Sequence, residues 1–175
     1  EVIGLLAKPA ILYYLADMLS TFTRIESYVI PVRVRRGLWR KIRFNDMDID
    51  SLMRIREALD EQQRFSYYKR IADVCLFILG MFPEYAQFDY RYPSSGQVRP
   101  KIAGRIRRGM EDYEEEGRRF YKLAAEHQSA TTLDLSEVLW LLHENFNAAK
   151  KPMNFIAEYY LHYKKHQLFG MRPDS

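Results

Sequence analysis

The segment from about Phe65 to Phe82 most constrains the fold of this chain, because its second half is apolar on nearly every helical face. A helix that is apolar all round lies in the interior, with other helices packed against it. Pro83 follows directly and cannot continue the helix. The sequence therefore predicts a central buried helix that ends at this proline. Cys75 lies inside the same apolar run, so we expect a buried thiol that behaves as a small hydrophobe.

Five further segments have apolar residues at helical spacing. They cover residues 9–23, 50–62, 101–127, 135–146 and 152–169. Pro9 and Pro152 suit the first position of a helix, where the missing N–H has no partner to lose. The sequence "DLSE" at 134–137 has the spacing of an N-terminal cap. Gly104 and Gly109 predict an interruption early in the fourth segment, and Gly170 predicts the end of the last one.

The stretch "VIPVRVRRGLWRKIRF" at 29–44 breaks the helical pattern. Apolar and basic residues alternate on both sides of Gly37, as in a strand pair, and Pro31 is typical of an edge strand. Residues 83–100 hold prolines, a glycine and several aromatics, which predicts a long irregular loop. Together these patterns predict one all-α domain over residues 1–175. It is a bundle of about six helices with a short extended or hairpin arm after the first.

Three aspartates at alternate positions, Asp46, Asp48 and Asp50, raise the question of a calcium loop, with Glu57 at its twelfth place. A calcium loop needs oxygen ligands near its ninth place, and Arg54 stands there. Acidic residues at this point also suit a helix start, where they accept hydrogen bonds from free N–H groups. We therefore interpret the cluster as a helix cap.

Other metal-binding patterns are incomplete. "HENFN" at 143–147 has one histidine where a zinc-protease helix has two. Glu158, His162 and His166 follow one another at four-residue steps, but the outer two lie about 12 Å apart along a helix and cannot share one ion. The sequence also has no glycine-rich phosphate loop and no nucleophile elbow. We expect no metal, no cofactor and no catalytic residue, which favours a non-enzymatic protein.

The arm carries the most distinctive charge pattern of the chain. Between positions 33 and 43, six of eleven residues are basic and none is acidic. A cationic arm with an aromatic residue can follow a phosphate backbone and stack a base. Two other interpretations stay open: six acidic residues between positions 46 and 61 neutralise the arm, or the charges prevent unwanted strand pairing. The candidate polyanion-binding residues are Arg33, Arg35, Arg36, Trp39, Arg40, Lys41 and Arg43.

Two stretches carry a resemblance to known proteins: "RIADVCLFILGMFPE" at 70–84 and "EEGRRFYKLAAEH" at 115–127. They resemble a group of uncharacterised bacterial helical proteins. In that group an apolar helix ends in Gly-hydrophobic-Phe-Pro-Glu, and a Gly-Arg-Arg-aromatic helix follows. The resemblance covers about half of the chain and implies a bacterial helical domain. It implies no activity, ligand or functional residue.

Composition and charge bear on the location and the partners of the protein. A net charge of +4, a single cysteine and no membrane-length apolar run indicate a cytoplasmic protein that does not enter a membrane. We expect an interaction or scaffolding domain that forms a homo-oligomer or binds a protein partner. The tyrosines near 85–92 and 159–163 are either contact surfaces of such a domain or part of its core. The alternative is nucleic-acid or polyanion binding through the arm at 33–43. A third possibility is an enzyme or carrier with an apolar pocket between helices.

Overall fold

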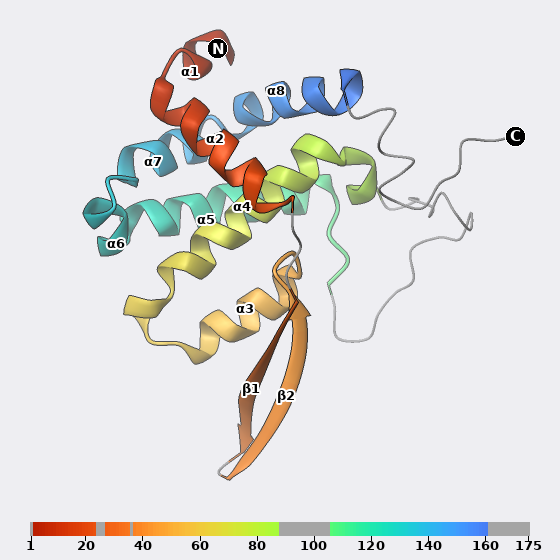
Figure 1. The fold of residues 1–175 in the computed structure, drawn as a ribbon, viewed down its shortest axis with the longest axis vertical. Coiled ribbons are helices and arrows are strands. Elements are labelled where there is room, and N and C mark those ends of the chain that lie inside the picture. Colours follow the sequence, from red (N-terminus) through yellow and green to blue (C-terminus); the bar gives the residue numbers. More distant parts are fainter. Residues whose placement is uncertain (1, 24–26, 36, 88–105, 161–175) are drawn as a thin grey trace, which may run out of the picture.

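The computed structural model describes residues 2–23, 27–35, 37–87 and 106–160, and within them the chain forms eight α-helices and one two-stranded sheet (Figure 1). The predicted all-α class with an arm after the first long helix is confirmed. The helices are α1 (Val2–Leu6), α2 (Pro9–Thr21), α3 (Ile49–Ala58), α4 (Phe65–Met81), α5 (Met110–Glu126), α6 (Gln128–Thr132), α7 (Ser136–Glu144) and α8 (Phe146–Tyr159). The strands are β1 (Ser27–Arg35) and β2 (Leu38–Asn45), and two 3-10 turns cover Glu61–Gln63 and Pro83–Ala86.

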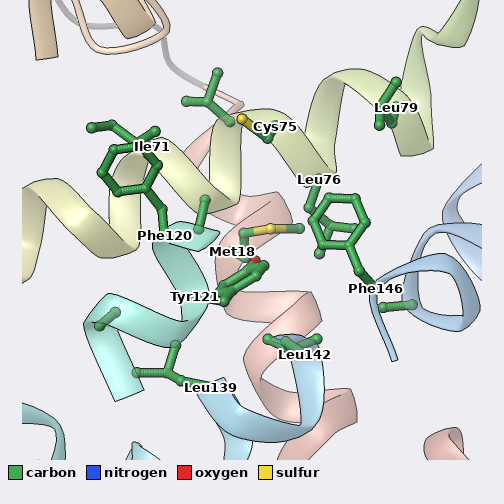
Figure 2. Packing of buried hydrophobic residues seen from close by; sticks show 14 of the residues in the cluster. Met18, Ile71, Cys75, Leu76, Leu79, Phe120, Tyr121, Leu139, Leu142 and Phe146 are labelled. Atoms are coloured by element: carbon green, nitrogen blue, oxygen red, sulfur yellow. The ribbon is translucent and has the colours of Figure 1, made fainter. Parts of the chain in front are cut away.

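Helix α4 is the centre of the core, as its all-round apolar sequence predicts. It packs against α5, α8 and α3, and Ile71, Val74 and Leu76 are fully buried. Figure 2 shows side chains from α2, α5, α7 and α8 converging on it. Helix α4 ends at Met81, and one residue separates it from the 3-10 turn that begins at Pro83, so the predicted stop is confirmed. Cys75 is also fully buried, as expected.

Two glycines let the helices around α4 approach closely. A Cβ atom at Gly117 in α5 would lie 2.5 Å from Cε2 of Phe146 and 3.0 Å from the Cβ of Cys75. A Cβ atom at Gly80 in α4 would lie 2.9 Å from the Cβ of Met153. Phe146 therefore packs α8 against Gly117 of α5, and Met153 packs it against Gly80 of α4. Any side chain at either glycine would occupy the space that these residues fill.

The predicted cap at Asp134 is wrong. Asp134 has a φ of 55° and lies between α6 and α7, and the N-cap of α7 is Leu135, which makes no side-chain cap bond. The backbone N–H of Leu135 bonds to the carbonyl of Ala130 at 2.8 Å and closes the end of α6. Aspartate tolerates the left-handed conformation better than most residues. Asp134 thus ends one helix and does not begin the next.

The predicted start of the last helix at Pro152 is also wrong, because α8 begins at Phe146 and holds this proline in its interior. A proline inside a helix removes one backbone hydrogen bond and costs about 3 kcal/mol. The burial of Phe146 and Ala149 before the proline, and of Met153 after it, offsets that cost. The predicted end near Gly170 lies outside the described residues.

The hairpin of β1 and β2 extends away from the helices, with its turn at the far end (Figure 1). Its antiparallel register pairs Ser27 with Asn45 and Ile30 with Ile42. Gly37 lies in the turn with a φ of 82°, a left-handed conformation that glycine adopts at no steric cost. Each strand packs chiefly against the other strand. The hairpin is therefore a projection from the helical body and not a part of its core.

Candidate functional site

The structure places six of the seven candidate basic-arm residues on the two strands of the hairpin, and the seventh, Arg36, lies outside the described residues. The register sets Arg33 opposite Trp39, Pro31 opposite Lys41, and Val29 opposite Arg43. Residues opposite each other in an antiparallel pair lie on the same face, and alternate residues of one strand do too. The register therefore brings four of the candidates to positions on one face: Arg33, Trp39, Lys41 and Arg43. Arg40 is opposite Val32 and falls on the other face, and the register is irregular between Arg33 and Arg35.

The opposite face of the hairpin has mostly apolar positions. Tyr28 is opposite Phe44 and Ile30 is opposite Ile42. The two strands thus form a ribbon whose faces differ in charge. One face has three basic positions, Arg33, Lys41 and Arg43, beside Val29, Pro31 and Trp39, and the other has apolar positions and a single basic one, Arg40. We call the first the basic face and the second the apolar face of the hairpin.

The acidic residues that follow the arm have partners in the helical body. Asp46 pairs with Arg70 of α4, and Asp50 pairs with Arg108 at 2.8 Å. Glu61 pairs with Arg64 at 2.9 Å. These carboxylates are thus engaged by other cations, which weakens the interpretation that they neutralise the arm.

The predicted helix cap at the aspartate cluster is confirmed. Asp48 is the N-cap of α3: its Oδ1 accepts from the backbone N–H of Ser51 at 3.5 Å, and its Oδ2 accepts from the Ser51 hydroxyl at 2.7 Å. The aspartates on either side point to guanidinium groups, as described above. Within the described ranges, no group of three or more His, Cys, Asp or Glu side chains could hold a metal ion.

A buried carboxylate joins three helices of the core. Asp73 of α4 is 2 % exposed. Its Oδ1 accepts from the hydroxyls of Tyr14 in α2 at 2.7 Å and Tyr121 in α5 at 2.8 Å, and its Oδ2 accepts from Nζ of Lys69 at 2.8 Å. Burial, and then the Asp73 charge, raise the pKa of both tyrosines well above the usual value. We call this the Asp73 network. Its signal in the sequence is an acid within an apolar helix, which needs a buried partner.

A second buried ion cluster lies at Arg108, just before α5. Arg108 is 4 % exposed, and it pairs with Asp50 of α3 and with Glu116 of α5. Burial lowers the pKa of its guanidinium, but the hydrogen bonds and charges of the two carboxylates outweigh burial and raise it. One arginine thus fastens α3 to α5. Nothing in the sequence distinguishes this residue from the neighbouring Arg107, so pattern alone could not identify it.

The predicted tyrosine contact surfaces are only partly within the described residues. Near the end of α8, Tyr159 and Tyr160 are 67 % and 71 % exposed, and the ring of Phe155 contacts that of Tyr159 at 4.4 Å between centroids, with the ring planes tilted by 35°. Tyr85 is half-buried. Phe88, Tyr90, Tyr92 and Tyr163 lie outside the described residues, as do His162 and His166 of the incomplete metal pattern.

A recess of about 180 Å³ lies on α5 and is lined by Asp112, Glu115, Glu116 and Arg119. Its walls are charged, so it lacks the apolar lining that a carrier for a hydrophobic ligand requires. In the described segments, no helix is both long enough and apolar enough to cross a membrane.

Comparison with known proteins adds no assignment: no family model matches the chain, and no curated protein or solved structure matches it. The resemblance to bacterial helical proteins therefore stays a prediction. Among the described residues, the basic face of the hairpin is the most specific functional feature.

Proposed function

We propose that this protein binds double-stranded DNA through the basic face of its hairpin. The observation that supports the proposal is a two-stranded ribbon that extends from the helical body and carries basic residues at neighbouring positions of one face. Basic side chains bind phosphates at any sequence, and the contacts release condensed counterions. A projecting ribbon can reach them without any change in the helices.

The shape of the hairpin favours duplex DNA over other nucleic acids. The major groove of B-form DNA is about 12 Å wide and admits a two-stranded β-ribbon. The major groove of duplex RNA is deep and narrow, and a ribbon does not enter it. Single strands are usually bound by concave grooves with several stacking aromatics, whereas the basic face has one, Trp39. We therefore expect the order duplex DNA, then single-stranded DNA, then duplex RNA.

Fluorescence-anisotropy titration over a salt series tests the proposal. With three to five phosphate contacts, the slope of log K against log salt is about −3 to −5. The test variant changes Arg33, Lys41 and Arg43 to Gln. The control variant changes Lys8, Lys122 and Lys151 to Gln, which removes the same charge from exposed positions of the body.

We expect the hairpin variant to lose about 100-fold in affinity at 0.15 M salt and its slope to become shallower by about 3, since each lost phosphate contact removes about 0.9 from the slope. The body variant should change little. Equal losses in the two variants would show that only net charge matters. Undiminished binding by the hairpin variant would also contradict the proposal.

The apolar face of the hairpin favours a second function, protein interaction or self-association. A two-stranded hairpin alone is marginally stable in water and gains stability when one face is covered. Light scattering tests this: a mass above 20.9 kDa that falls when Ile30 and Ile42 are changed to Thr supports a second copy at this face. A monomer at every concentration excludes self-association and leaves a different protein as the partner, to be sought by co-purification.

A further inference from the structure

The root of the hairpin, where both strands join the helical body, is organised around one side chain, Arg70 of α4. Its Nη1 donates to Oγ1 of Thr21 at 2.7 Å. Its Nε donates to the carbonyl of Asp46 at 3.1 Å, and its Nη2 pairs with the Asp46 carboxylate. Its Cζ lies 4.0 Å from the centroid of the Phe22 ring, in the geometry of a cation–π contact.

These contacts engage the chain both before and after the hairpin. Thr21 is the last residue of α2, and Phe22 follows it. Asp46 comes directly after β2. Arg70 is 49 residues from Thr21 and 24 from Asp46, so these are tertiary contacts and not a result of local chain geometry. We call Arg70, Thr21, Phe22 and Asp46 together the joint.

The joint is shielded from water and backed by the core. The side chains of Arg70 and Asp46 are 16 % and 18 % exposed. Phe22 is buried, and its ring stacks on Phe77 of α4 at 4.0 Å with an angle of 15° between the ring planes. The guanidinium, Phe22 and Phe77 thus form one stack. Ionic contacts at this degree of exposure are screened less than surface pairs.

We propose that Arg70 is a positioning residue that fixes the direction of the hairpin relative to the helical body. Arginine suits this role because its planar fork presents five donors in fixed directions and also stacks on an aromatic ring. A lysine at this position would keep the charge but could not hold a hydroxyl, a carbonyl and a carboxylate in one plane. The consequence for DNA rests on the proposed function: a hairpin held in one direction loses less conformational freedom on binding.

The first experiment measures the direction of the hairpin without any ligand. Spin labels at Lys41→Cys in β2 and Gln128→Cys in α6 report the distance between hairpin and body. Cys75 is buried, so it stays unlabelled. We expect a narrow distance distribution in the otherwise unchanged chain, and broader ones in Arg70→Gln and, less so, in Arg70→Lys. Arg118→Gln, an exposed arginine of α5, is the matched control and should keep the narrow distribution.

Circular dichroism of each variant shows whether the helical body is folded. If Arg70→Gln does not fold, Thr21→Val replaces it, since that change removes one acceptor of the joint and leaves the ion pair. The proposal is overturned if the folded variants keep the narrow distribution. It is supported if the distribution broadens while the helix content stays unchanged.

A second measurement separates positioning from direct contact with DNA. If Arg70 only positions the hairpin, Arg70→Gln weakens duplex binding by about tenfold, through a larger ordering cost, while the salt slope stays constant. If Arg70 bound a phosphate, the slope would become shallower by about 1, and the positioning role in binding would be wrong. Should the unchanged protein not bind DNA at all, the proposed function fails, and the distance measurement still decides the role of Arg70.

Discussion

The Asp73 network gives the sharpest prediction for the stability of the core. Its carboxylate accepts three hydrogen bonds, two from the tyrosine hydroxyls of α2 and α5 and one from Lys69. Changing Asp73 to Asn keeps the size and shape of the side chain but removes the charge. The amide oxygen can still accept from Tyr14 and Tyr121, but the amide NH₂ then faces the Lys69 ammonium, and both groups are donors.

The cost follows from the bonds that change. The charge-assisted bond to Lys69 is lost, and such bonds contribute about 1.5–3 kcal/mol. The two tyrosine bonds become bonds between neutral groups, which are roughly half as strong as those to a charged acceptor. The Lys69 side chain is 23 % exposed and can turn partly to solvent, which reduces the loss. We therefore expect Asp73→Asn to lower the free energy of unfolding by about 3 kcal/mol.

Urea denaturation followed by circular dichroism measures this change, and a double-mutant cycle with Lys69→Met assigns it. We expect the double variant to be more stable than the sum of the two single changes predicts, by about 1 kcal/mol, because the unpaired ammonium is removed. A loss below about 1 kcal/mol for Asp73→Asn would be the size of one ordinary hydrogen bond, and it would refute the role of Asp73 as the charged centre of the network.

Two further predictions concern the same core. Gly117→Ala should lower the free energy of unfolding by about 1–2 kcal/mol in urea denaturation, because the strain of displacing the Phe146 ring exceeds the gain in helix propensity; an increase in stability would contradict the close packing. The stability should also fall above about pH 10, because Tyr14 and Tyr121 keep their protons in the folded protein while the unfolded chain loses them. Each tyrosine contributes a slope of about 1.4 kcal/mol per pH unit, so Tyr14→Phe should reduce the alkaline slope by that amount, and an unchanged slope would show that burial does not retain its proton.

The elements that could be predicted from the sequence are those that local pattern determines. Helix α4 follows from its apolar faces and Pro83, and the hairpin follows from alternation around Gly37. The errors occur where tertiary packing overrides a local signal. Pro152 has the features of a helix start, but burial of Phe146 against Gly117 places the start earlier. Asp134 has the features of a cap, but it occupies the left-handed position that closes α6.

The candidate site also has a part that the sequence predicts and a part that only the structure shows. The basic residues of the arm could be predicted from composition, and their placement on one face required the register. The joint at Arg70 could not be predicted, because its partners are 24 and 49 residues away. No local pattern around Arg70 indicates which residues it contacts.

The joint at Arg70 also bears on how this chain could change over evolution. Thr21 and Asp46 are bound by the same guanidinium, so the points where the chain leaves and re-enters the helical body lie close together. The two strands between them, β1 and β2, have the geometry of an insertion. The strands can thus lengthen, shorten or be replaced while the core stays as it is. The helical body can stay constant while the hairpin varies. We therefore expect the residues of the joint to be substituted more slowly than those of the two strands.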